Sequence, residues 1–241
     1  MGNRIREYDV MKAIAIVLVV LGHSYFLGSH GISMSEYISL SDNTVARIFN
    51  NQIGDWIYAF HMPLFMAISG ALSCSKFERL SDISFKDYAI SRFKRLMIPF
   101  YIVGIIYAVP VKFIAGYYFD WSLIKSYIWS VVVFQTPAHL WFLVTLFLLD
   151  IIFGALSKKK WQYSKAIFPV LIAMFLVSPY LSGINLIYRL FQNAVWFYIG
   201  LCFEHFEIRK KLSRGGIPLV TKLAMLCHVD PVALYIRPCT Y

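Results

Sequence analysis

Hydrophobic residues gather along this chain in long runs, separated by short polar segments that are rich in lysine and arginine. Six of the runs are long enough to cross about 30 Å of hydrocarbon as α-helices. They occupy residues 10–27, 54–73, 96–116, 140–157, 166–182 and 185–206. A further apolar run at 127–134 is too short to cross a bilayer. The pattern predicts an all-α protein, a polytopic bundle of about six transmembrane helices.

The lysines and arginines follow the predicted spans with a regular asymmetry. Four segments hold nearly all of them: the N-terminus, 74–95, 158–165 and the chain after 206. The two intervening loops, 29–53 and 117–139, carry one basic residue each. Because basic loops stay on the cytoplasmic side of a membrane, we expect six spans with both termini in the cytoplasm.

Composition supports the membrane class. The residues AVILMFWYC make up 59% of the chain, charged residues only 15%, and the mean hydropathy is +0.62. A soluble protein of 241 residues cannot bury so much apolar surface. The net charge of +10 comes mostly from the cytoplasmic loops, so it does not call for a nucleic acid, and no basic soluble face is evident.

The first apolar run contains two ionisable residues, Lys12 and His23. Eleven helical steps of about 100° return to within about 20° of the starting face, so both residues face the same way, roughly 16 Å apart along the axis. An ionisable group at membrane depth is costly and by default marks a function. The alternative is a histidine satisfied by a neighbouring helix.

A second histidine, His61, lies in the second run, in the sequence AFHMPLFMAISG. Pro63 removes one backbone hydrogen bond and predicts a kink there. By position, His23 and His61 lie at a similar depth in the outer half of the bilayer. Two histidines at one depth on adjacent spans favour a polar site, whereas His61 alone would fit a kinked packing helix.

On the cytoplasmic side, Arg92 and Arg95 precede the third span in the sequence SRFKRLMIP. Residues three apart share a helix face, and paired guanidinium groups bind phosphate well. Ordinary cytoplasmic anchoring explains the same two residues. Asp150 lies in the middle of the fourth span and needs a partner, for which a histidine or an arginine such as Arg189 is a candidate.

Four cysteines occur, at 74, 202, 227 and 239. None has a CxxC spacing, so structural thiols are expected rather than a metal site or disulfide bonds. No other motif calls for a metal.

Five elements together carry a family resemblance. In chain order they are REYDVMKAIAIVLVVLGHS, FHMPLFMAISG, RFKRLMIP, HLWFL and WFYIGLCFE, and they span about residues 4–207. They resemble the integral-membrane acyltransferase family 3, in particular its branch similar to fucose 4-O-acetylases of bacterial surface polysaccharides.

The resemblance implies an O-acyltransferase of the bacterial cytoplasmic (inner) membrane, O-acetyltransferase being the simplest case. Its partners would be the lipid bilayer, an acyl-CoA donor such as acetyl-CoA, and a hydroxyl of a cell-surface carbohydrate or its lipid-linked precursor. The donor is a co-substrate, and no bound cofactor is expected. His23 would be the general base or a transient acyl carrier, and His61 would orient the acceptor. Arg92 and Arg95 would hold the coenzyme's phosphates, and Lys12 matches the family's basic position before the histidine.

The chain departs from the family at its C-terminus. Members usually have about ten spans, whereas residues 1–212 supply six. From residue 213 the sequence has only short apolar runs, interrupted by prolines, so residues 213–241 are interpreted as an atypical tail, truncated or out of frame. Two other classes therefore stay open: a transport component for polysaccharide or lipid precursors, and an inactive truncated membrane protein.

Overall fold

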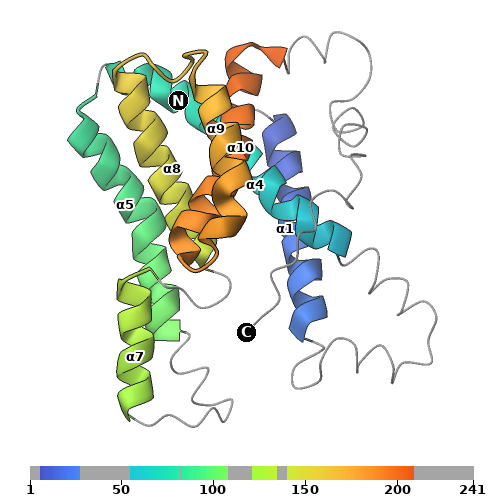
Figure 1. Cartoon of the computed structure of the whole chain (residues 1–241), viewed down its shortest axis with the longest axis vertical. Helices are drawn as coiled ribbons and strands as arrows, with labels where there is room; N and C mark the ends of the chain where they lie inside the picture. The colour runs from blue at the N-terminus through green and yellow to red at the C-terminus, as the bar shows by residue number, and fades with distance from the viewer. Residues whose placement is uncertain (1–5, 28–54, 82, 108–120, 135–139, 209–241) are drawn as a thin grey trace, which may run out of the picture.

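The computed structural model describes residues 6–27, 55–81, 83–107, 121–134 and 140–208 (Figure 1). Helices are the only regular secondary structure in these ranges, which confirms the predicted all-α class. The elements are α1 (Arg6–Leu27), α4 (Asp55–Glu78), η2 (Arg79–Ser81), α5 (Phe85–Tyr101), η3 (Ile102–Tyr107), α7 (Trp121–Val132), α8 (Trp141–Lys158), α9 (Ile167–Val177), η4 (Ser178–Leu181) and α10 (Asn185–His205). The tail 213–241 and His139 lie outside the described residues.

The helices follow the predicted apolar runs but extend beyond them on the basic side. Helix α4 continues through Pro63 and ends at Glu78, and α5 begins at Phe85, whereas the apolar runs end at 73 and begin at 96. Amphipathic turns therefore prolong both helices past the apolar stretch that a hydrophobicity pattern detects. The continuation of α5 is a π-helical turn, η3.

Membrane character is clearest in two helices of the described part of the chain. By length and composition, α8 and α10 suit a bilayer span, with mean hydropathies of 1.8 and 1.2. A shorter apolar helix covers Ile167–Leu181. These features agree with a membrane protein, and the count of six spans stays a prediction.

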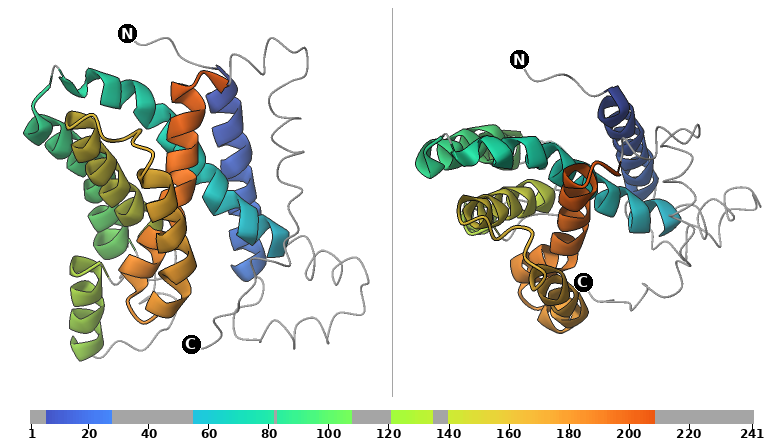
Figure 2. Two further views of the ribbon diagram at one scale, coloured as in Figure 1. Left: turned by 45° about the horizontal axis from the view of Figure 1, so that its top comes forward. Right: turned by 90° about the horizontal axis from the view of Figure 1, so that it is seen from above.

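Helices α1, α4, α5, α8, α9 and α10 run in alternating directions (Figures 1 and 2). The starts of α1 and α5 and the ends of α4, α8 and α10 all lie at one end of the molecule, which we call the basic end. The predicted cytoplasmic segments 74–95 and 158–165 adjoin this end.

Two glycines allow α4 and α10 to cross with their backbones in contact. A Cβ atom added to Gly70 would lie 1.9 Å from the carbonyl oxygen of Phe197, and one added to Gly200 would lie 1.8 Å from that of Ala67. Small residues at a crossing let membrane helices approach closely. The side chains beside the crossing, Met66, Phe197 and Leu201, are fully buried.

Replacing Gly200 by alanine should therefore push α10 away from α4 and lower the stability of the fold. Overpacking of this kind costs about 1–3 kcal/mol. Thermal unfolding of the detergent-solubilised chain should show a lower Tm for Gly200→Ala. The matched control is Gly183→Ala, because a Cβ there meets nothing within 4 Å. Equal melting of the two variants would contradict the close crossing.

Helix α1 lies against α4 through a small apolar cluster made of Tyr8, Ala15, Ile68 and Ala71. The hydroxyl of Tyr8 also donates a hydrogen bond to Glu204 of α10, at 2.5 Å. The outer face of α1 is apolar and exposed, as expected for a surface in contact with lipid tails. It consists of Val10, Ile14, Ile16, Val17, Val20 and Leu21.

Candidate active site

The structure places the two predicted catalytic histidines on neighbouring antiparallel helices. His23 belongs to α1, although its side chain lies outside the described residues. The apolar cluster that joins α1 and α4 contains Ala15 and Ile68. His23 follows Ala15 by about 12 Å of helix, and His61 precedes Ile68 by about 10.5 Å. Both residues therefore lie beyond this cluster on the side away from the basic end, and a common depth in the bilayer stays a prediction.

His61 is 2% exposed and is held by the turn before it. Its Nδ1 atom lies 2.6 Å from the carbonyl oxygen of Ile57. A carbonyl oxygen only accepts, so Nδ1 carries the proton and donates it, and this bond fixes both the tautomer and the orientation of the ring. A ring fixed in this way is suited to orient a substrate or to stabilise charge.

At the basic end, Arg92 forms the centre of a buried ionic network. Its Nε atom lies 3.4 Å from Oδ2 of Asp150 in α8, with 7% and 3% of the two side chains exposed. The same Nε donates to the hydroxyl of Tyr88 at 3.2 Å, and the guanidinium lies 5.3 Å from the centre of that ring. Ser73 of α4 donates to Oδ1 of Asp150 at 2.8 Å. The network ties α4, α5 and α8 together.

The suggested pairing of Asp150 with Arg189 is therefore wrong. Arg189 donates to Asn185 at 3.3 Å, and its guanidinium lies 4.6 Å from the ring of Trp141. The reason is helix direction, because α10 begins at the end opposite to the basic end (Figure 2). Arg92 occupies the position beside Asp150 because α5 begins eleven residues before the apolar run.

Lys76 lies close enough to the predicted phosphate-binding residues for their charges to act on it. Burial, and then the positive charges of Arg92, Arg95 and Lys12, lower the pKa of Lys76 to about 8, against the attraction of Asp150. The three predicted donor-binding residues thus share an electrostatic environment with a fourth cation. We call Lys12, Lys76, Arg92 and Arg95 the basic cluster.

The members of the basic cluster differ in exposure. Arg92 is buried, and its Nη2 atom has no hydrogen-bond partner among the described residues. Arg95 is exposed, and it lines a surface groove of about 480 Å³ together with Asp87, Ile90, Ser91 and Lys94. Lys12 is 38% exposed and lies 3.9 Å from Asp9. Arg92 and Arg95 are therefore an inner and an outer cation rather than a pair on one open surface.

Sequence reasoning missed Lys76, Tyr88 and Ser73. One signal was present for Tyr88, which precedes Arg92 by one helical turn and shares its face. Burial raises the pKa of Tyr88 to about 12, so its hydroxyl stays neutral. Nothing in the local pattern marked Lys76, which looked like one more basic residue of a cytoplasmic loop.

The described residues thus form a helical protein with membrane-type helices. It has a pair of histidines on adjacent helices and a cluster of cations at one end. Residues 5–229 match the acyltransferase domain family (Acyl_transf_3), and the chain belongs to this family. The predicted family is confirmed.

Among curated proteins, the chain is similar to two nodulation proteins called NolL. It is 38% identical to that of Sinorhizobium fredii over 80 residues, which are 33% of this chain and 19% of that protein. It is 37% identical to that of Mesorhizobium japonicum over 84 residues, which are 33% of this chain and 18% of that protein. The similarity thus covers about a fifth of the length of either relative. No solved structure matches the chain.

Proposed function

We propose that the protein is a membrane-bound O-acyltransferase that moves an acyl group from an acyl-CoA donor to a hydroxyl of a cell-surface carbohydrate or its lipid-linked precursor. Acetyl is the simplest acyl group that the donor could supply. The observation that carries the proposal is the basic cluster, four cations of which one is a buried arginine, in a member of an acyltransferase family.

The proposed setting is the bacterial cytoplasmic membrane, crossed six times with both termini inside. The alternating helix directions support this topology, since α1 begins and α10 ends at the basic end. So does the distribution of lysine and arginine, which favours a cytoplasmic basic end. Acyl-CoA is a cytoplasmic metabolite class, so the basic cluster faces the compartment that supplies the donor.

The donor would bind through its phosphates. Coenzyme A carries a diphosphate and a 3′-phosphate, and charge-assisted hydrogen bonds from guanidinium and ammonium groups are the strong contacts to such anions. Arg95 is the exposed member of the basic cluster, so a phosphate would meet it first. Arg92 is buried, and its Nη2 atom is a donor that a phosphate oxygen would satisfy.

Acyl transfer would take place nearer the opposite end, at the histidine pair. His23 would remove the proton from the acceptor hydroxyl while the hydroxyl oxygen attacks the thioester carbonyl. The carbon–sulfur bond then breaks, the coenzyme thiolate leaves and takes up the proton, and an ester remains on the sugar. Lys12 and His23 share one face of α1, roughly 16 Å long. The acyl arm of the donor would follow this face from the basic cluster to the histidine pair.

Replacing Arg95 by alanine should raise the apparent KM for the acyl donor and change that for the acceptor less. The reason is the loss of one charge-assisted phosphate contact, worth about 1.5–3 kcal/mol, or roughly tenfold or more in KM. Lysine at this position should restore only part of the affinity, because it binds phosphate as a point charge. Initial rates with purified protein at varied donor concentration measure the effect.

Lys86→Ala is the matched control, since Lys86 is an exposed cation of the same helix outside the basic cluster and outside the groove that Arg95 lines. Equal increases in donor KM for Arg95→Ala and Lys86→Ala would indicate general surface charge and would contradict a specific phosphate contact. A normal donor KM with poor membrane insertion of Arg95→Ala would make Arg95 a topological anchor.

A further inference from the structure

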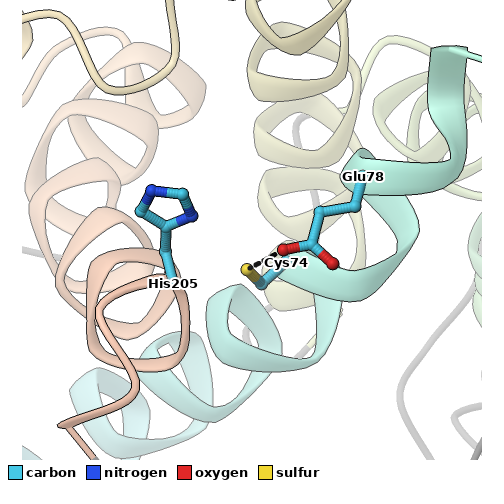
Figure 3. Close-up of side chains that lie close together, drawn as sticks. All are labelled: Cys74, Glu78 and His205. Carbon is cyan, nitrogen blue, oxygen red and sulfur yellow. Dashed lines mark hydrogen bonds between the residues drawn. The ribbon is translucent and has the colours of Figure 1, made fainter.

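Three side chains with metal-binding atoms converge at the basic end, outside the site described above (Figure 3). Cys74 and Glu78 lie one turn apart near the end of α4, and His205 is the last residue of α10. The thiol sulfur, a carboxylate oxygen and an imidazole nitrogen all lie within 4.8 Å of one another. Cys74 is buried, whereas Glu78 and His205 are exposed.

The fold itself holds these side chains together. Cys74 follows Gly70 by one turn and His205 follows Gly200 by five residues, so the close crossing of α4 and α10 sets the separation of their ends. Tyr163, in the segment between α8 and α9, covers the cluster from a third direction. Its ring stacks on His205 with 3.5 Å between the centroids and an angle of 17°. Its hydroxyl lies 3.6 Å from the sulfur of Cys74.

We propose that Cys74, Glu78 and His205 bind a divalent transition-metal ion of the zinc type that ties the end of α4 to the end of α10. Thiolate, imidazole and carboxylate are the three ligand types that zinc takes in proteins, and three protein ligands leave a fourth position for water. Two of the ligands come from positions i and i+4 of one helix, the spacing at which helical metal ligands share a face.

The geometry needs only a small adjustment. With bonds of about 2.3 Å to sulfur and about 2.0 Å to nitrogen, ligand atoms around a tetrahedral ion lie roughly 3.5 Å apart. The thiol already lies 3.8 Å from Oε1 of Glu78. Glu78 and His205 are exposed, whereas Cys74 is buried, so the adjustment falls on the two exposed side chains. On binding, the thiol loses its proton to solvent, and its sulfur supplies the electron pair to the metal.

The position of the cluster indicates a structural ion rather than a catalytic one. His61 precedes Cys74 by thirteen residues on α4, which is about 20 Å of helix. The metal would therefore lie far from the proposed acyl transfer and would act by joining helices. An ion that binds only the folded chain raises its stability in proportion to ligand concentration. The fold should then melt at a higher temperature with metal than with a chelator.

The test uses the full chain, purified in detergent under reducing conditions, stripped with a chelator and then supplied with Zn²⁺ alone. Zinc content after gel filtration should approach one ion per chain, and Tm should rise. His205→Ala and Cys74→Ser should lose both effects. The matched control is Cys202→Ser, a half-buried thiol of α10 outside the cluster, and it should keep both. Co²⁺ in place of Zn²⁺ should give a thiolate-to-metal absorption band that Cys74→Ser removes.

A stripped wild-type chain that takes up no zinc and whose Tm ignores added Zn²⁺ would overturn the proposal. Zinc uptake that survives in both His205→Ala and Glu78→Gln would also overturn it, because the ion would then be bound elsewhere. Glu78 and His205 are exposed, so these two variants test the ligands without disturbing the buried core.

Discussion

Replacing His23 by alanine should reduce acyl transfer by about 10² to 10⁴ while membrane insertion stays intact. This is the range that removal of a positioned general base costs. The acceptor hydroxyl is a poor nucleophile until its proton is removed, and His23 and His61 are the histidines of α1 and α4. The measurement is transfer of a labelled acyl group to the acceptor in membranes, divided by the amount of inserted protein.

Ser24→Ala is the matched control for His23→Ala, because it alters the adjacent residue of α1, about 100° around the helix. It should transfer at nearly the normal rate. His61→Ala separates two roles. A smaller loss than in His23→Ala fits orientation of the acceptor, and an equal loss means that the two histidines act as one unit. Near-normal turnover in a correctly inserted His23→Ala chain would make His23 a packing residue.

The sequence predicted the extent of each helix well inside its apolar run and less well beyond the end of that run. The pattern located α8 and α10 to within a residue or so because the mean hydropathy of both is high. It could not show that α4 reaches Glu78 or that α5 starts at Phe85, since those turns are charged on one face. Amphipathic turns at a membrane surface have the composition of a loop, and only the packing of their side chains distinguishes such turns from a loop.

The extension of α5 before the apolar run also explains why the two predicted arginines, Arg92 and Arg95, differ in burial. Two arginines three positions apart looked equivalent on a helix surface, but α8 covers one of them, so Arg92 is buried against Asp150 while Arg95 stays exposed. Pairing between residues 58 positions apart depends on helix order and tilt, which a single sequence does not contain. The convergence of Cys74 with His205 is of this kind too, because it follows from a crossing at Gly70 and Gly200.

Replacing Asp150 by alanine should destabilise the protein by about 3–5 kcal/mol, the cost of leaving one charge of a buried pair without its partner. The guanidinium of Arg92 has little access to water, and Asp150 carries the only carboxylate that the described residues place against it. Chemical or thermal unfolding in detergent measures the loss. Asp87→Ala is the matched control, because Asp87 is an exposed acid on α5, and it should melt like the wild type.

A double variant separates the two roles that Arg92 has in this structure. Arg92→Met with Asp150→Leu replaces the whole ion pair by apolar groups, and such replacements are often neutral or stabilising. The double variant should therefore regain most of the stability that Asp150→Ala loses. Its donor KM should be higher than that of the wild type, because the Nη2 donor of the basic cluster is gone. If stability and donor KM both return to wild-type values, Arg92 serves the fold alone, and the phosphate contact rests on Arg95 and Lys76. If the double variant melts no higher than Asp150→Ala, the hydrogen bonds of Tyr88 and Ser73 to the pair matter more than its charges.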